Sequence, residues 1–572
     1  MIGFGRELKD YSFASRREFI LVSGNAYCSS SLAGNTRKYH GLLVCNGRVY
    51  LSALDEFVNG RRISSARYAD CICDEGLEFI QAFGLYPPTF HYFIDSTAVR
   101  KTISFDGAVR ITYDVCGKAD IAVVPLVADR GVHKTRKTFD FRQKKIGNGV
   151  SVGKLTIKSS ADFYENPDVY WNVFYERDFE RGYECVENLY TPGRFIARVS
   201  NGSFEIVANV DGCEIYESLA ENQKARSAIE CLELAANSFV VGDTIYAGHH
   251  WFAEPWGRDT FVSLPGLLIE RSRLDVARKV FKFFATRMKR GLIPNRTSSE
   301  VSDVSDQSDC YNSSDASLWF VYALEKYLEK TGDTEFVEKM KPYVEDIVVR
   351  YPESGVAELD KGLISVRACS TWMDTRFTPR EGKPVEVNAL WINTLRFADR
   401  IGIHCPDSSV KAEKAFRRFW NPKKGCFYDV IDPYDDSIRP SQVIAVALNT
   451  ADEGKATSIL EVVGKELLTP YGLRTLSPRD KRYIGRFRGD ESYHNGCVWP
   501  WLLGFYVEAL LNHGWAKDRL QLLIAPLLEH VRDVGLGTIS EIFDGDAPHE
   551  PNGCISQAWS VAEVIRAYRL LE

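Results

Sequence analysis

The sequence predicts an N-terminal antiparallel β-sandwich followed by an all-α toroid of helices. Turn signals of the Asn-Gly and Asp-Gly type separate alternating or β-branched segments as far as residue 215. After residue 240, long amphipathic runs with helical period replace them. With 572 residues, the chain is also too long for one ordinary core. Two large domains are therefore expected.

The β part is defined by its turns. Each turn signal lies between segments such as VRITYDV and RFIARVS, which alternate or are β-branched. We expect a hairpin at each of five places, namely CNGRV (45–49), VNGRR (58–62), FDGAV (105–109), SNGSF (200–204) and VDGCE (210–214).

The segment 217–239 has helical period and bridges the two parts. The runs beyond it often close on Gly or Pro, as helix C-termini do. They cover residues 273–291, 315–332, 334–351, 384–402, 410–420, 456–467, 498–514 and 558–572. We place the sandwich at residues 1–225, a helical linker at 226–244 and the helical domain at 245–572.

Composition limits the function. A net charge of −6 and a pI near 6.0 give no electrostatic reason to bind nucleic acid or an anionic membrane. The charged N-terminus has no apolar leader segment, so we expect a cytoplasmic protein. The 14 cysteines are scattered without zinc or redox spacing, and we interpret them as reduced, mostly buried thiols.

The loops between the helical runs share an unusual composition, since they are dense in Trp, Tyr, Asn, Asp, Glu and Gly. Aromatic rings can cover the apolar faces of a pyranose, while carboxylates, amides and guanidiniums bind its hydroxyls. These loops therefore predict a sugar pocket. They are HHWFAEPWGRDT, GLIPNRT, DCYNSSDASLW, STWMDTR, ESYHNGCVWPW and SEIFDGDAPHEPNGCISQAWS.

The same loops carry a family resemblance. The segments SSSLAGNTRKYHGLLV, PWGRDT, LIPNR, SSDASLWF, TWMD, GKPVEVNALW, RPSQ, TPYGLRTLSP, YHNGCVWPW, SEIFDGD and CISQAWS follow one another along nearly the whole chain. Together they resemble the archaeal and bacterial type of glycogen debranching enzyme, the amylo-α-1,6-glucosidase kind.

The resemblance implies that the toroid is a catalytic (α/α)6 barrel and that the chain hydrolyses the α-1,6-linked glucose at branch points of glycogen or limit dextrin. No cofactor and no metal are expected. Eukaryotic debranching enzymes also carry a 4-α-glucanotransferase domain, for which the β part has no room. We therefore expect the glucosidase half only, unless its one site accepts longer branches. Branched α-glucan is the expected partner, and a separate transferase is expected in the same pathway.

Two carboxyl groups are assigned to the chemistry. Asp374 follows Trp372 and Met373, whose apolar surroundings would raise its pKa, and the resemblance places the general acid in this motif. An inverting glycosidase also needs an ionised base, for which we choose Glu541. Asp544 and Asp546 in the same loop are competitors, although FDGDAP is also typical of a turn.

Several residues are predicted to contact the sugar. In glucoamylases related by the resemblance, an Arg-Asp pair like Arg258 and Asp259 binds the terminal glucose, although Asp259 could also be a helix cap. Asp315 could equally be an N-cap, and Glu386 lies early in a helix where the dipole stabilises a carboxylate. The full set is Trp256, Arg258, Asp259, Asp315, Trp319, Trp372, Glu386, Trp391, Tyr493, His494, Trp499, Gln557 and Trp559.

Other functions remain open at this point. His249, His250 and the acidic DGD could bind a metal, but no metal-binding spacing accompanies them. A glucoamylase- or trehalase-like exo-α-glucosidase would use a similar pocket. A non-catalytic glucan-binding protein would also need the sugar contacts, though not both carboxyl groups.

Overall fold

The computed structural model describes residues 2–215, 225, 227–297, 309–405 and 407–572. They form two compact units. The first contains the residues as far as Leu234 together with Val531–Gly537, and the second contains Ala235–His530 and Thr538–Glu572. Part of the predicted linker, residues 216–224 and 226, lies outside the described residues, and Ala228–Ser238 form helix α4.

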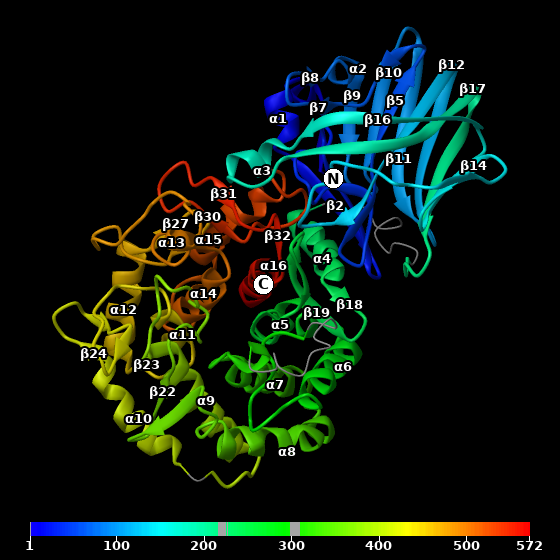
Figure 1. Ribbon diagram of the computed structural model, residues 1–572. Helices are drawn as coiled ribbons and strands as arrows, with labels where there is room; N and C mark the ends of the chain where they lie inside the picture. The colour runs from blue at the N-terminus through cyan, green and yellow to red at the C-terminus, as the bar shows by residue number, and fades with distance from the viewer. Residues whose placement is uncertain (1, 216–224, 226, 298–308, 406) are drawn as a thin grey trace. The chain divides into compact units, whose positions relative to one another are not determined.

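The first unit is an antiparallel β structure organised by two long strands, β12 (Val109–Gly131) and β17 (Val186–Val210), which pair with each other. The first half of β12 also pairs with β11 (Thr97–Phe105), and its second half pairs with β5 (Arg48–Val58). β17 is divided in the same way between β15 (Leu155–Ser159) and β16 (Asp162–Phe174). The long strands therefore run through both layers of a β-sandwich (Figure 1).

The other strands extend these layers. Along β11 and β12, residues alternate between buried and more exposed positions, which is the pattern of a sheet with one face on the core. The remaining strands of the sheet are β1 (Gly3–Phe4), β2 (Glu18–Ser23), β3 (Ala26–Ser31), β4 (Gly41–Cys45), β6 (Arg61–Arg62), β9 (Ile80–Gly84), β10 (Thr89–Ile94), β13 (Gln143–Lys145) and β14 (Gly149–Val152).

Three of the five expected hairpins form, at CNGRV, VNGRR and FDGAV. At VDGCE the backbone N–H of Cys213 donates to the Val210 carbonyl in a turn, but no strand follows in residues 213–215, so the described residues show no hairpin there. Asn46 and Gly47 have φ of 49° and 68° in the hairpin between β4 and β5, as a type I′ turn requires. The prediction of a hairpin at SNGSF is wrong, because Asn201 and its neighbours continue inside β17. The Asn201 side chain instead accepts a hydrogen bond from the backbone N–H of Gly117 at 2.8 Å, where the register of β12 shifts. An Asn-Gly pair can thus mark a bulge as well as a turn.

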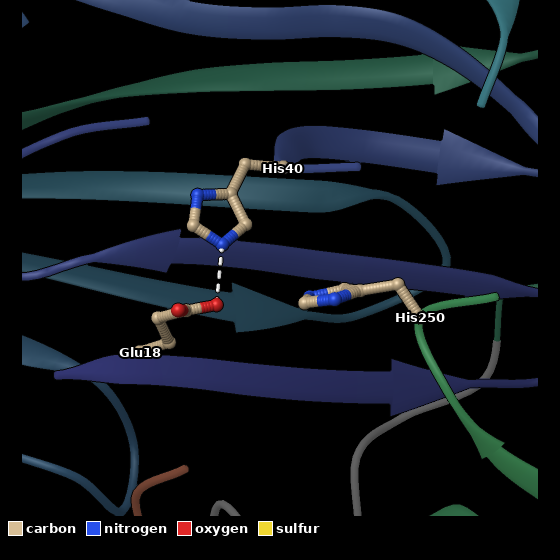
Figure 2. A group of neighbouring side chains, drawn as sticks. All are labelled: Glu18, His40 and His250. Carbon is tan, nitrogen blue, oxygen red and sulfur yellow. Dashed lines mark hydrogen bonds and ion pairs between the residues drawn. The ribbon is translucent and has the colours of Figure 1, made fainter. Parts of the chain in front are cut away.

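Two features tie the first unit together. Buried Glu18 accepts hydrogen bonds from Arg37 Nε at 2.9 and 3.0 Å, and its Oε2 lies 2.9 Å from His40 Nε2 (Figure 2). Cys45 and Cys213 form a disulfide with their Cα atoms 6.1 Å apart. The expectation that the cysteines are all reduced is therefore wrong for this pair. The expectation that they are mostly buried is also wrong, since five of the 12 free cysteines are buried.

The second unit contains helices that contact one another in a closed cycle. In the order of the cycle they are α5 (Gly257–Leu264), α7 (Ala316–Thr331), α9 (Val385–Arg400), α11 (Gln442–Ala447), α14 (Leu502–Asn512) and α16 (Ala558–Leu571), and α16 returns to α5 (Figure 1). The intervening helices pack on this ring, namely α6 (Leu274–Ala285), α8 (Thr334–Arg350), α10 (Ser409–Phe416), α12 (Glu453–Glu466) and α15 (Lys517–His530).

The ring closes through a close approach of backbones. A π-helical turn, Pro265–Ile269, continues α5 and contacts α16. A Cβ atom at Gly266 would lie 1.9 Å from the carbonyl oxygen of Ala562, so only glycine allows this contact. The predicted runs match α6 to α10, α12, α14 and α16, whereas α5, α11 and α15 were not among them. Among the described residues, no helix has the length and apolar content that crossing a membrane would need.

Candidate active site

The loops that were predicted to form a sugar pocket precede helices of the ring. Trp256 is the residue before α5, Asp315 is the N-cap of α7, and Asp374 lies in the loop before α9. Tyr493 ends the short helix α13 (Asp490–Tyr493) ahead of α14, and Glu541 precedes strand β30 (Ile542–Phe543) ahead of α16. The candidate residues thus lie on the loops that precede α5, α7, α9, α14 and α16 of the ring.

Arg258 links two of these loops. Its guanidinium is 5% exposed and donates from Nε to Asp315 at 2.7 Å and from Nη1 to Asp374 at 3.3 Å. Nη2 lies 3.2 Å from both Ser313 Oγ and the carbonyl oxygen of Ser370. Most of its donors therefore hold protein groups, and Arg258 positions Asp374 more directly than it could grip a sugar.

Asp374 combines exposure with a perturbed carboxyl group. Its side chain is 45% exposed, although Trp372 and Met373 before it are buried. Crowding by the surrounding protein raises the pKa of Asp374; the negative charge of Asp315 adds to the rise, and the Arg258 guanidinium opposes it. A carboxyl group that can reach a ligand and that retains its proton to higher pH has the properties of a general acid.

Glu541 has the opposite surroundings. It is buried, its Oε1 accepts a hydrogen bond from the Tyr493 hydroxyl, and its Oε2 accepts one from the backbone N–H of Cys554 at 2.8 Å. Donors directed at a carboxylate favour its charged form. The backbone N–H of Glu541 in turn donates to the carbonyl of Cys554 at 2.9 Å. The side chain is therefore held as an acceptor.

The chain brings Cys554 to Glu541 through a short hairpin. Strand β30 pairs antiparallel with β31 (Pro551–Asn552), so the chain returns beside its starting point. Gly553 lies at the closest approach, with φ of 70°, and a Cβ atom there would lie 2.3 Å from Glu541 Oε2. Glycine is thus required both by the backbone angle and by the carboxylate.

The two competing carboxylates in this loop are engaged elsewhere. Asp544 accepts from the backbone N–H of Phe487 at 2.9 Å, from Asn552 at 3.0 Å and from Arg486 at 3.2 Å. Asp546 accepts from the Tyr483 hydroxyl at 2.9 Å. These bonds hold the loop in place, as the turn interpretation of FDGDAP expects.

Asp259 is a third carboxyl group in the same neighbourhood. It is 9% exposed, and Gln557 Nε2 lies 3.4 Å from its Oδ1. Burial raises the pKa of Asp259 to about 7; Arg258 lowers it, while the charges of Glu541 and Asp374 raise it further. Because both carboxylates act on it, Asp259 lies within electrostatic reach of Asp374 and Glu541.

Five of the predicted aromatic residues form one cluster, namely Trp372, Tyr493, His494, Trp499 and Trp559. The Trp372 ring is 5.5 Å from those of both His494 and Trp499, and Trp499 is 4.8 Å from Tyr493 and 5.5 Å from Trp559. Burial and three nearby arginines lower the pKa of His494 well below its usual value, which disfavours the charged imidazolium. The cluster therefore supports the loops that carry Asp374 and Glu541.

Four predicted sugar contacts have no surface to offer in this structure. Asp315 at the N-cap of α7 and Trp319, Glu386 and Trp391 within α7 and α9 are all 0% exposed. Both carboxylate oxygens of Glu386 accept hydrogen bonds from Arg380, so this side chain holds a buried ion pair instead of a ligand. Position early in a helix could not reveal that these side chains face the packed interior.

Within the part of the chain that the structure describes, some predicted contacts keep a buried polar atom without a partner, and the indole N–H groups of Trp319 and Trp391 are among these atoms. Asp315 is fully buried, and its Oδ2 has no hydrogen-bond partner among the described residues. The same holds for the indole N–H of Trp256, which is half-buried, and for that of Trp559. His249 was considered as a metal ligand, but its Nε2 lies 3.2 Å from the carbonyl oxygen of Ser238, within hydrogen-bond distance.

Sequence reasoning missed several residues of this site. Trp501 lies 5.3 Å from Trp372 and 5.2 Å from Trp559, at the centre of the aromatic cluster. The VWPW segment contains it, but nothing in the sequence distinguishes it from Trp499. Gly553 and Cys554 were also missed, because they reach Glu541 through a hairpin for which no local signal exists. Tyr493 was predicted as a sugar contact, whereas its hydroxyl donates to Glu541 across 48 residues.

Comparison with known proteins gives two family matches. Residues 230–566 match the family described as amylo-alpha-1,6-glucosidase, and residues 17–204 match that described as glycogen debranching enzyme N terminal. The glycogen debranching enzyme of Saccharomyces cerevisiae is 22% identical over 375 residues, which cover 44% of this chain. The match spans only 24% of the length of the yeast protein.

Solved structures show more distant likeness. A GH63 mannosylglycerate hydrolase from Thermus thermophilus, in complex with Tris and D-glycerate, is 13% identical with a TM-score of 0.46, covering 60% of this chain and 99% of that one. A rhamnosidase from Klebsiella oxytoca with rhamnose bound is 14% identical with a TM-score of 0.47, covering 75% and 89% of the two chains.

Proposed function

The chain belongs to the amylo-alpha-1,6-glucosidase family, and from this premise we propose that it is a glycoside hydrolase that releases glucose from α-1,6 branch points of glycogen or limit dextrin with inversion. The observation that carries the proposal is the contrast between two carboxyl groups. Asp374 is half-exposed with a raised pKa, whereas Glu541 is buried beneath two hydrogen-bond donors.

Asp374 acts as the general acid. It protonates the oxygen that bridges the branch glucose to the main chain, so that the leaving sugar departs as a neutral alcohol. Arg258 holds the carboxyl group in place through Nη1 and moderates the rise in its pKa. Asp374 can thus donate its proton when the glycosidic bond breaks and take up another from water afterwards.

Glu541 acts as the general base. It removes a proton from a water molecule that attacks the anomeric carbon from the opposite side of the ring, which forms β-glucose. Tyr493 and the backbone N–H of Cys554 both donate to the Glu541 carboxylate and hold it in one orientation. This mechanism predicts that the two carboxyl groups lie roughly 6.5–9.5 Å apart in the complex with substrate.

The terminal glucose binds around Asp259 and the aromatic cluster. At neutral pH Asp259 can both donate and accept a hydrogen bond, because its pKa is about 7. Trp559 is 5% exposed, and its indole N–H has no hydrogen-bond partner among the described residues. Sugar hydroxyls satisfy groups of this kind.

The cyclic arrangement of ring helices and outer helices supports an (α/α)6 barrel as the catalytic domain, with a domain change at residues 226–244. The partners are glycogen or branched α-glucan oligosaccharides. A separate 4-α-glucanotransferase shortens the branches, and both proteins act in the cytoplasm.

An assay of glucose release tests the proposal. The chain is incubated with phosphorylase limit dextrin, an isomaltose-type branched oligosaccharide, linear maltooligosaccharides and trehalose, with Glu541→Gln as the inactive control. The proposal expects release from the two α-1,6 substrates. Faster release from linear chains would indicate a glucoamylase-like enzyme, and faster release from trehalose a trehalase. Binding without any release would indicate a glucan-binding protein.

A further inference from the structure

A pocket in the first unit is lined mainly by basic and hydroxyl side chains. It has a volume of about 570 Å³ and is lined by Arg48, Arg130 and the loop residues 134–140. This size falls within the range of small-molecule sites, about 300–1,000 Å³. We propose that the pocket binds the phosphate group of a small ligand, a function separate from glucan hydrolysis.

The walls of the pocket are fixed by two ion pairs. Arg130 is 4% exposed and donates to both oxygens of Glu187 at 2.8 Å. Arg48 donates from Nη2 to Asp129 at 2.8 Å. The two bonds to Glu187 hold the buried pair rigidly. A third bond runs from Arg130 Nη1 to the Gly131 carbonyl, so these bonds use three of the five guanidinium N–H groups. Arg130 is therefore a fixed cationic group in the wall.

The loop adds positive charge that is not neutralised. Within the described residues, no carboxylate forms an ion pair with Lys134, Arg136 or Lys137. Lys137 donates to the Val186 carbonyl, which leaves its charge in place. Asp140 is the acidic residue in the lining. It offsets one of these three charges, so two positive charges remain uncompensated.

The donors include neutral and planar groups. Arg136 Cζ lies 4.8 Å above the ring of Phe141, a stacking contact that fixes the guanidinium and leaves its N–H edge available. The hydroxyl of Thr135 is buried and has no hydrogen-bond partner among the described residues. Guanidinium, ammonium and hydroxyl donors together match the oxygens of a phosphate.

Phosphate chemistry explains these features better than a sugar or a cation does. The whole chain carries a net charge of −6, so a local surplus of positive charge is an exception to its general field. A neutral glucan would gain nothing from that surplus, and a cation would be repelled. The loop lies in residues 131–142, away from the helical domain in sequence, and none of its residues is used in the proposed hydrolysis.

Isothermal titration calorimetry of the full chain with inorganic phosphate at low ionic strength tests the proposal. Saturable binding of one phosphate is expected. Arg136→Gln and Lys134→Ala should each weaken it by about tenfold, because each removes a charge-assisted contact. Lys154→Ala is the matched control. Lys154 is an exposed residue of the same unit that does not line the pocket, and its substitution removes the same charge. It should change the affinity by less than about twofold.

Parallel titrations with glucose 1-phosphate, glucose 6-phosphate and glucose distinguish the sources of the phosphate. Tighter binding of one ester than of inorganic phosphate, lost in the same two variants, would support the site and identify its ligand as a sugar phosphate. Binding that Arg136→Gln and Lys134→Ala leave unchanged would overturn the proposal, as would the absence of saturable phosphate binding. Circular dichroism confirms that each variant is folded, and no measurement depends on catalysis.

Discussion

Replacing Tyr493 with phenylalanine should slow turnover by about 10- to 150-fold without unfolding the protein. Burial raises the pKa of Tyr493 well above its usual value, so the hydroxyl keeps its proton and donates to Glu541 Oε1. A hydrogen bond to a charged group contributes about 1.5–3 kcal/mol, and each 1.36 kcal/mol corresponds to a tenfold change in rate. Because phenylalanine retains the ring, its contact with Trp499 at 4.8 Å survives.

The assay is initial-rate glucose release from limit dextrin across a range of pH, with kcat and KM separated. The loss should fall on kcat, since the bond orients a base and binds no substrate. Tyr483→Phe is the matched control, because its hydroxyl donates to Asp546 at 2.9 Å in the same loop. The assignment of Glu541 as a base positioned by the Tyr493 hydroxyl would be contradicted by either of two results. One is a kcat of Tyr493→Phe within about threefold of the parent, and the other is an equal loss of kcat in Tyr483→Phe.

Three further predictions follow from the same contacts. Asp374→Asn should lower kcat on branched glucan by about 10²–10⁴-fold but impair hydrolysis of α-glucosyl fluoride far less, because fluoride leaves without a proton; equal losses on both substrates would contradict the acid role. Between about pH 4 and 7 the folded protein keeps a proton on Asp259 that the unfolded chain has lost, so this group destabilises the fold as pH rises. Relative to the parent, Asp259→Asn should therefore gain up to about 4 kcal/mol of unfolding free energy from pH 4 to 8 in urea titrations, and parallel stability curves would refute the assignment. Alkylation of the unreduced, denatured protein should label 12 of its 14 cysteines, with Cys45 and Cys213 protected; 14 labels would contradict the disulfide.

Local patterns predicted the elements well because turns and amphipathic helices are determined by neighbouring residues. Asn46 and Gly47 form the hairpin that their sequence indicates, and α7 ends at Gly332 in the left-handed conformation. Asn201 shows the limit, since the same dipeptide signal lies inside a long strand where Gly117 of the neighbouring strand needs an acceptor. That requirement comes from pairing across 84 residues.

The candidate site was predicted less completely, for a related reason. Composition identified the loops, but the direction of each side chain depends on packing. Glu386 appeared to be available at a helix start, yet it is enclosed with Arg380, and Arg258 is committed to Asp315 and Asp374. The Tyr493 bond that distinguishes Glu541 from Asp544 is visible only once the loops are assembled.

The stereochemistry of the first product tests the central proposal most directly. Proton NMR can follow the anomer of glucose released from an α-1,6-branched oligosaccharide before mutarotation mixes the two forms. With Asp374 as acid and Glu541 as base on opposite sides of the sugar, β-glucose should appear first and α-glucose only later. Initial release of α-glucose would mean retention through a covalent intermediate and would contradict the proposed roles of both carboxyl groups.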